Sequence, residues 1–191
     1  MPIRAALPAD AAAIAGVHVR SWQVAYRALL PHPYLDGLDV EERTAVWAAR
    51  LEAPEPASVL VATEPGGRVV GFCAFRAWPD DDLDAATTGE IAALYAAPEV
   101  WGSGVGRGLL AASEEALAAD GFREGALWVL ADNARGRRFY DAAGWRPDGT
   151  VVQDTTAGRT LDELRYRRTL FVRPTARTVH PHGEMPISPC D

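Results

Sequence analysis

The segment from Pro98 to Leu110, PEVWGSGVGRGLL, constrains the fold of this chain more than any other segment. Glycines occupy alternate positions in it, at 102, 104, 106 and 108, and the sequence then continues directly into a helical pattern. A glycine inside a helix costs about 1 kcal/mol relative to alanine, so the series needs a physical reason. Close approach of a ligand to the backbone is one reason, and tight packing of helix on strand is the alternative. An apolar run precedes the glycines, which predicts a strand, a glycine loop and a helix in succession.

The apolar periodicity of the whole chain predicts an α/β domain with a single central mixed sheet, about seven strands flanked by about four helices. The sequence PGG at residues 65–67 predicts a hairpin between two of the strands. The expected strands cover residues 2–6, 58–64, 68–78, 90–98, 125–131, 145–152 and 161–170. The expected helices cover residues 7–30, 39–52, 104–119 and 133–144, with a break at 31–37 and a turn-rich connection before the last strand.

The length of 191 residues suits one domain with a tail. Residues 1–170 carry the periodic patterns, whereas residues 171–191 hold four prolines and no periodicity, so we expect a loosely ordered tail there. The formal net charge of −7 argues against nucleic acid or an anionic membrane as the main partner. The N-terminal residues lack the apolar region of a signal peptide and no run reaches transmembrane length, so a cytoplasmic location is expected.

Several phosphate-binding and metal-binding motifs are missing. The chain contains no lysine, which excludes a P-loop, and the glycine spacing does not match a Rossmann fingerprint, which disfavours a dinucleotide-dependent oxidoreductase. Cys73 and Cys190 lie far apart without nearby histidines, so neither a disulfide nor a zinc site is expected, and Cys73 is predicted to be a core residue. The remaining interpretation is a helix N-terminus that receives a pyrophosphate.

Two segments in the right order resemble the GCN5-related N-acetyltransferase (GNAT) family. EIAALYAAPEVWGSGVGRGLL is similar to the family's acyl-CoA-binding motif, with Gly104 and Gly106 at its two glycine positions and Trp101 where the family has Gln or Arg. NARGRRFYDAAGW is similar to the second family signature, which here consists of Asn133, Tyr140, Gly144 and Trp145. The resemblance covers about residues 2–170.

The resemblance implies an N-acetyltransferase that moves an acetyl group from acetyl-CoA to a primary amine by direct attack in a ternary complex, without a metal. It implies that Glu90 acts as the general base, directly or through water, and that Tyr140 acts as the general acid. A solvated glutamate and a core aromatic residue are the alternatives for these positions. A non-catalytic acyl-CoA-binding module on the same fold is the alternative for the whole protein.

The resemblance also assigns the acetyl-CoA contacts. The strand before the loop offers backbone groups to the pantetheine arm, the loop and the helix start hold the pyrophosphate, and Asn133 bonds the pantetheine or caps its own helix. Arg107 meets phosphate or is a solvated helix residue. The predicted acetyl-CoA-binding residues are Leu94, Tyr95, Ala96, Trp101, Gly102, Ser103, Gly104, Val105, Gly106, Arg107 and Asn133.

The acceptor side is less defined. Trp22, Tyr26 and Tyr34 are predicted to line the acceptor pocket, with core packing as the alternative. The acidic connection around Asp82 either attracts a cationic amine or keeps an exposed loop soluble. A small-molecule amine and a peptide amine both fit, and a homodimer is expected only by analogy with the family.

Overall fold

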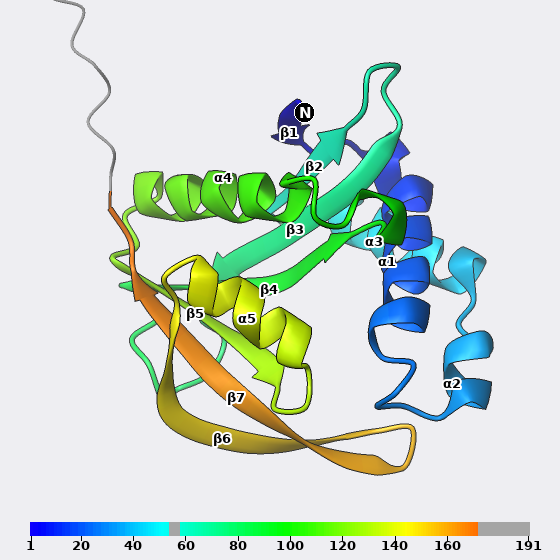
Figure 1. Cartoon of the computed structure of the whole chain (residues 1–191). Coiled ribbons are helices and arrows are strands. Elements are labelled where there is room, and N and C mark those ends of the chain that lie inside the picture. Colours follow the sequence, from blue (N-terminus) through cyan, green and yellow to red (C-terminus); the bar gives the residue numbers. More distant parts are fainter. Residues whose placement is uncertain (54–57, 172–191) are drawn as a thin grey trace, which may run out of the picture.

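A computed structural model of the protein describes residues 1–53 and 58–171. Within them the chain forms one seven-stranded sheet with the strand order β1-β2-β3-β4-β5-β7-β6, flanked by helices on both faces (Figure 1). This arrangement confirms the predicted α/β class and the single mixed sheet. The predicted tail, apart from Phe171, lies outside the described residues.

All neighbouring strands in the sheet are antiparallel except β4 and β5, which are parallel. Each strand overlaps a residue range in which a strand was predicted. The strands are β1 Ile3–Ala5, β2 Ser58–Thr63, β3 Val69–Ala77, β4 Thr88–Ala96, β5 Glu124–Leu130, β6 Arg146–Thr156 and β7 Arg159–Thr169.

The described residues form five α-helices rather than about four. The first helix does end before residues 31–37, as predicted, but His32–Asp36 of this segment forms a short helix of its own. The first turn of this helix accommodates Pro33 without loss of a helical hydrogen bond. The α-helices are α1 Ala11–Ala25, α2 His32–Asp36, α3 Val40–Glu52, α4 Val105–Ala119 and α5 Ala134–Ala142, with 3-10 turns at Pro8–Asp10 and Pro98–Val100.

The helices cover the sheet in two layers (Figure 1). Helix α4 packs across β2, β3 and β4 on one face, where α5 also lies against β5. Helix α1 packs on β3 and β4 from the opposite face and is itself covered by α3. Leu109 and Cys73 are fully buried on the α4 side, and Trp47 and Phe72 are buried on the α1 side, which confirms the predicted core position of Cys73.

The hairpin of β6 and β7 is longer than predicted. The residues expected to form a turn-rich connection continue both strands, and the chain reverses at Ala157 and Gly158, which both have positive φ angles of 52° and 74°. Two consecutive residues with positive φ form the tight turn whose twist matches that of the flanking strands. Thr155 pairs with Thr160 next to this turn, and such cross-strand pairs stabilise the extended hairpin.

Candidate active site

The parallel strands β4 and β5 separate partway along their length. They pair only from Thr88 with Glu124 to Glu90 with Ala126, after which β5 continues beside β7 and β4 continues beside β3. A β-bulge lies at this point, because the register with β3 passes from Ile91 to Ala93 and leaves Ala92 unpaired. Bulges bend the strand that carries them, which explains why β4 turns away from β5 here.

The second half of β4 therefore has one edge without a partner strand in the described part of the chain. Ala97 N–H donates to Val70 of β3, so by the alternation of an antiparallel ladder the N–H and C=O groups of Leu94 and Ala96 face away from β3. The structure thus brings the predicted residues Leu94 and Ala96 to the open edge. The backbone N–H and C=O groups of Tyr95 instead point toward β3.

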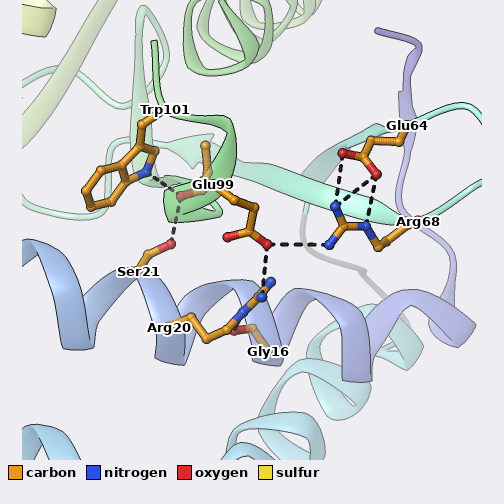
Figure 2. A network of polar contacts seen from close by, with 8 residues as sticks. Gly16, Arg20, Ser21, Glu64, Arg68, Glu99 and Trp101 are labelled. Atoms are coloured by element: carbon orange, nitrogen blue, oxygen red, sulfur yellow. Dashed lines mark hydrogen bonds and ion pairs between the residues drawn. The ribbon is translucent and has the colours of Figure 1, made fainter. Parts of the chain in front are cut away.

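One of these groups is already bonded. The Ala96 carbonyl accepts hydrogen bonds from Trp101 Nε1 at 2.7 Å and from Ser21 Oγ at 2.9 Å (Figure 2). Of the backbone groups expected to be available to the pantetheine arm, the Ala96 carbonyl is therefore already bonded within the protein. The indole N–H of Trp101 thus connects the glycine loop to the end of β4 by a hydrogen bond. The family motif did not indicate this role.

Trp101 is also covered on its ring face. The Arg135 guanidinium, at the start of α5, lies 3.8 Å from the Trp101 ring centroid, a cation–π contact. Trp101 thus attaches the glycine loop to the end of β4 and to Arg135 of α5, while Ser21 attaches the same end of β4 to α1. Both attachments fix the loop relative to the open edge of β4.

A second set of polar contacts holds the loop from the side of α1. Glu99 Oε1 accepts from Arg20 at 3.0 Å and from Arg68 at 3.4 Å, and Arg68 also pairs with Glu64 (Figure 2). These side chains are exposed, so each pair contributes little to stability by itself. Their shared effect is to hold the first turn of the loop against α1 and the β2–β3 hairpin.

Helix α4 begins without a side-chain cap. Its N-cap residue is Gly104, which has a φ of 92° and no side chain to accept a hydrogen bond, and Ser103 Oγ bonds back to the Val100 carbonyl instead. Among the described residues, no acceptor is bonded to the backbone N–H groups of Val105, Gly106 and Arg107. Three free N–H groups at the positive end of a helix dipole form a ready site for an anion.

Helices α3 and α5, in contrast, begin with a side-chain cap. Asp39 accepts from two backbone N–H groups at the start of α3, and Asn133 Oδ1 accepts from Gly136 N at 2.9 Å at the start of α5. Asn133 therefore caps its own helix, which was one of the two roles expected for it. A hollow of about 190 Å³ also opens beside Gly104, whereas a larger one of about 490 Å³ between α1 and α2 contains none of the predicted site residues.

Glu90 lies at the last parallel pair of β4, where the strands begin to separate. Its side chain is 9% exposed, and Oε2 accepts from Arg76 Nε at 2.6 Å. Arg76 is 59% exposed, so the ion pair reaches from the sheet interior to solvent. The alternative of a solvated glutamate at a strand end is wrong, because this carboxylate is buried and paired.

Tyr140 lies on α5 and packs against Phe139, Trp145 and Tyr166 with ring centroids 5.1 to 6.3 Å apart. Burial raises the pKa of Tyr140, with smaller contributions from Cys73 and Tyr95. The phenol therefore stays protonated at neutral pH and is available as a proton donor. The aromatic packing expected as the alternative for Tyr140 is therefore present, and its role as general acid stays a prediction.

Two of the three predicted acceptor residues lie together. The rings of Trp22 and Tyr26 are 5.1 Å apart at the end of α1, and the Tyr26 and Tyr95 hydroxyls interact. The Trp22 indole N–H lies near Tyr95 but forms no hydrogen bond of normal geometry with any residue described. Tyr34 lies on α2, and its ring contacts none of these rings in the described structure.

Sequence reasoning missed the β7 side chains that face the same region. Arg165 is 7% exposed and is held by Asp148, Thr150 and Asp82, while Glu163 is half-buried two residues earlier. The alternation of LDELRYRR does place residues 163 and 165 on one face of a strand. The sequence does not show which other segments cover that face.

A separated parallel strand pair beside an uncapped helix start is the arrangement that the resemblance of the sequence motifs implies for acetyl-CoA binding. The sequence model of the acetyltransferase (GNAT) family matches residues 20–145, which is well over half of the chain. The chain belongs to the GNAT family, and it is an acyltransferase.

Relatives support this assignment. The chain is 34% identical to the uncharacterized N-acetyltransferase YuaI of Bacillus subtilis over 131 residues, which cover 69% of this chain and 72% of YuaI. It is 33% identical over 135 residues to the mycothiol acetyltransferase of Kocuria rhizophila, again over 69% of this chain. That match spans 41% of the longer mycothiol acetyltransferase.

Solved structures show the same fold. The yncA protein of Salmonella typhimurium, solved with its cofactor acetyl-CoA, is 26% identical, with a TM-score of 0.67 over 92% of this chain and 98% of its own. The PaiA N-acetyltransferase of Thermoplasma acidophilum, solved with coenzyme A, has a TM-score of 0.68 at 20% identity over 88% of this chain and 98% of its own. Residues 1–53 and 58–171 contain no helix with the length and apolar character needed to span a bilayer.

Proposed function

We propose that this protein transfers an acetyl group from acetyl-CoA to a primary amine by direct attack within a ternary complex. The observation that carries the proposal is the uncapped start of α4 beside the open edge of β4. The free N–H groups of Val105, Gly106 and Arg107 suit a pyrophosphate, and the backbone groups of Leu94 suit a pantetheine arm. Acetyl-CoA, which is present in the yncA structure, would supply the acetyl group as an activated thioester.

Two side chains of the protein, Glu90 and Tyr140, each carry out one of the two proton transfers. Glu90 Oε2 is held by Arg76, which leaves Oε1 to accept the proton of the attacking amine, directly or through water. The Tyr140 hydroxyl, kept protonated by its raised pKa, donates a proton to the departing sulfur. Separate acid and base groups on α5 and β4 let both transfers occur in one arrangement of the site.

The test is thiol release from acetyl-CoA across a panel of primary amines, with Glu90→Gln and Tyr140→Phe beside the wild type. Loss of a general acid or base lowers kcat by roughly 10²- to 10⁴-fold, and we expect a decrease in this range for each variant. Glu64→Gln is the control, because Glu64 is a carboxylate of the β2–β3 hairpin whose ion pair, among residues 1–53 and 58–171, is with Arg68.

Binding of acetyl-CoA, measured as a shift in melting temperature, shows that each variant is folded. Wild-type rates in both variants would remove Glu90 and Tyr140 from the mechanism. A wild type that binds acetyl-CoA but releases no thiol with any amine would indicate the non-catalytic binding module instead.

A further inference from the structure

Glu163 on β7 carries a carboxylate without a partner. It pairs in register with Leu130 of β5 and Val152 of β6, and it makes no hydrogen bond or ion pair with any residue in the described ranges. The nearest cation on the same face of the strand, Arg165, is already bonded to Asp82 and Asp148. No described cation therefore compensates the charge of Glu163.

Glu163 faces the region between the separated strands. Glu90 pairs with Ala126, and Ala126 pairs with Arg167 of β7, so Glu90, Arg167 and Glu163 lie on one face of the sheet. Tyr95 lies on this face as well, because it pairs with Phe72 while Glu90 pairs with Arg76, two residues of β3 with the same parity. The base proposed above and Glu163 thus lie on the same face of the sheet, on strands β4 and β7, which are separated by β5.

Two tyrosines stand beside the Glu163 carboxylate. Its charge contributes to the raised pKa of Tyr26, at the end of α1, and to that of Tyr95 on β4, although burial is the main cause in both cases. Burial raises the pKa of Glu163 itself, and the carboxylate of Asp154 on β6 raises it further. A carboxylate in partly apolar surroundings, next to aromatic rings, is the arrangement that binds an organic cation.

Three other carboxylates of the site, unlike Asp154, are already paired with arginine side chains. Glu90 is bonded to Arg76, and Asp82 and Asp148 are bonded to Arg165. We propose that Glu163 binds a positively charged group of the acceptor, so that the acceptor is an organic cation that carries a second charge besides the amine that is acetylated. This inference rests on the proposed function, and it assigns Glu163 to acceptor selection rather than to the chemical step.

The experiment compares three amines of equal chain length in full-length wild type and Glu163→Gln. Butylamine has no second charge, 1,4-diaminobutane has a second positive charge, and 4-aminobutanoate has a negative one. Loss of a charge-assisted hydrogen bond corresponds to about a tenfold weakening or more. We expect Glu163→Gln to raise KM for 1,4-diaminobutane by at least about tenfold while kcat changes much less, and to leave butylamine nearly unaffected.

Asp162→Asn is the matched control. It removes the same charge from the adjacent residue, whose side chain faces the other way and bonds Gln153 at 3.0 Å. Its KM for 1,4-diaminobutane should equal that of the wild type. An equal rise of KM for all three amines in Glu163→Gln would indicate a structural role and would overturn the inference.

The remaining outcomes separate the inference from the proposed function. A wild type that acetylates butylamine or 4-aminobutanoate but not 1,4-diaminobutane would overturn the inference alone. If none of the three amines is acetylated, the inference is tested by binding instead. 1,4-Diaminobutane is titrated into the wild type and into Glu163→Gln in the presence of coenzyme A, and the affinity is measured. Binding that Glu163→Gln weakens at least about tenfold supports the inference, and absence of binding to the wild type overturns it.

Discussion

At the scale of single residues, burial determines which side chains of this protein can carry charge. His18 is the clearest case on the α1 side of the sheet. Its Nδ1 accepts a hydrogen bond from Trp47 Nε1 at 3.4 Å. Burial, with smaller contributions from Arg43 and Arg50, lowers the pKa of His18 to about 4. Four aromatic rings surround it: Trp22, Trp47, Phe72 and Tyr95.

This pKa makes stability depend on pH. Unfolded histidine has a pKa of about 6.5, so between pH 6.5 and 4 the unfolded chain binds a proton that folded His18 does not. The contribution of His18 to the free energy of unfolding is fully present above pH 6.5. It is lost as the pH decreases from 6.5 to 4, by about 3 kcal/mol in total. Urea unfolding of wild type and His18→Gln from pH 7.5 to 4.5 measures this loss, which only the wild type should show. Parallel curves for the two proteins would contradict it.

Residue roles could be predicted from the sequence only where a local pattern defines them. Asp39 and Asn133 cap helices that begin directly after them, so their roles follow from the sequence alone. Glu90 was expected at a strand end, but its partner Arg76 lies on another strand and was not predicted. Glu163 and Arg165 escaped prediction because their surroundings come from four separate segments of the chain.

At the scale of elements, the start of α4 makes a prediction that separates binding from stability. Gly106 has an ordinary helical backbone, and a Cβ at this position would meet only the Phe139 ring at 3.5 Å, an ordinary contact. Gly106→Ala should therefore keep or raise stability, by up to about 1 kcal/mol. A methyl group next to the free N–H groups should nevertheless weaken acetyl-CoA binding, by about tenfold or more if it keeps the pyrophosphate from the backbone.

Calorimetric titration with acetyl-CoA measures the affinity, and thermal unfolding measures the stability. Gly16→Ala is a suitable control, because Gly16 lies in α1 with open space around its Cβ position. Unchanged acetyl-CoA affinity in Gly106→Ala would mean that the glycines of the loop serve packing alone.

Most helices and strands could be predicted, because hydrophobic periodicity and the positions of turn-forming residues are local properties of the sequence. All seven strands and four of the five α-helices overlap the ranges predicted for them, most of them from apolar periodicity. Helix α2 was missed because Pro31 and Pro33 resemble a helix break, although proline is compatible with a first helical turn. The long hairpin was missed because Thr, Asp and Gln in β6 are polar on both faces, so no alternation marks the strand.

At the scale of the whole molecule, the site is assembled from parts that are distant in sequence. Arg165 connects the segment before β4, through Asp82, to the β6–β7 hairpin, through Asp148 at 2.6 Å and Thr150 at 2.8 Å. Ser21 connects α1 to the end of β4. Such contacts hold the acceptor side and the acetyl-CoA side in fixed relation, as a direct transfer between two bound molecules needs.

The central claim is direct acetyl transfer to an amine, and initial-rate kinetics of the wild type test it most directly. Acetyl-CoA and an accepted amine are varied together, and mass spectrometry identifies the product. We predict an acceptor that gains one acetyl group and double-reciprocal lines that intersect, because both molecules must be bound before reaction. Parallel lines would indicate an acetylated protein intermediate and contradict direct transfer, and an amine that gains no acetyl group would contradict the function itself.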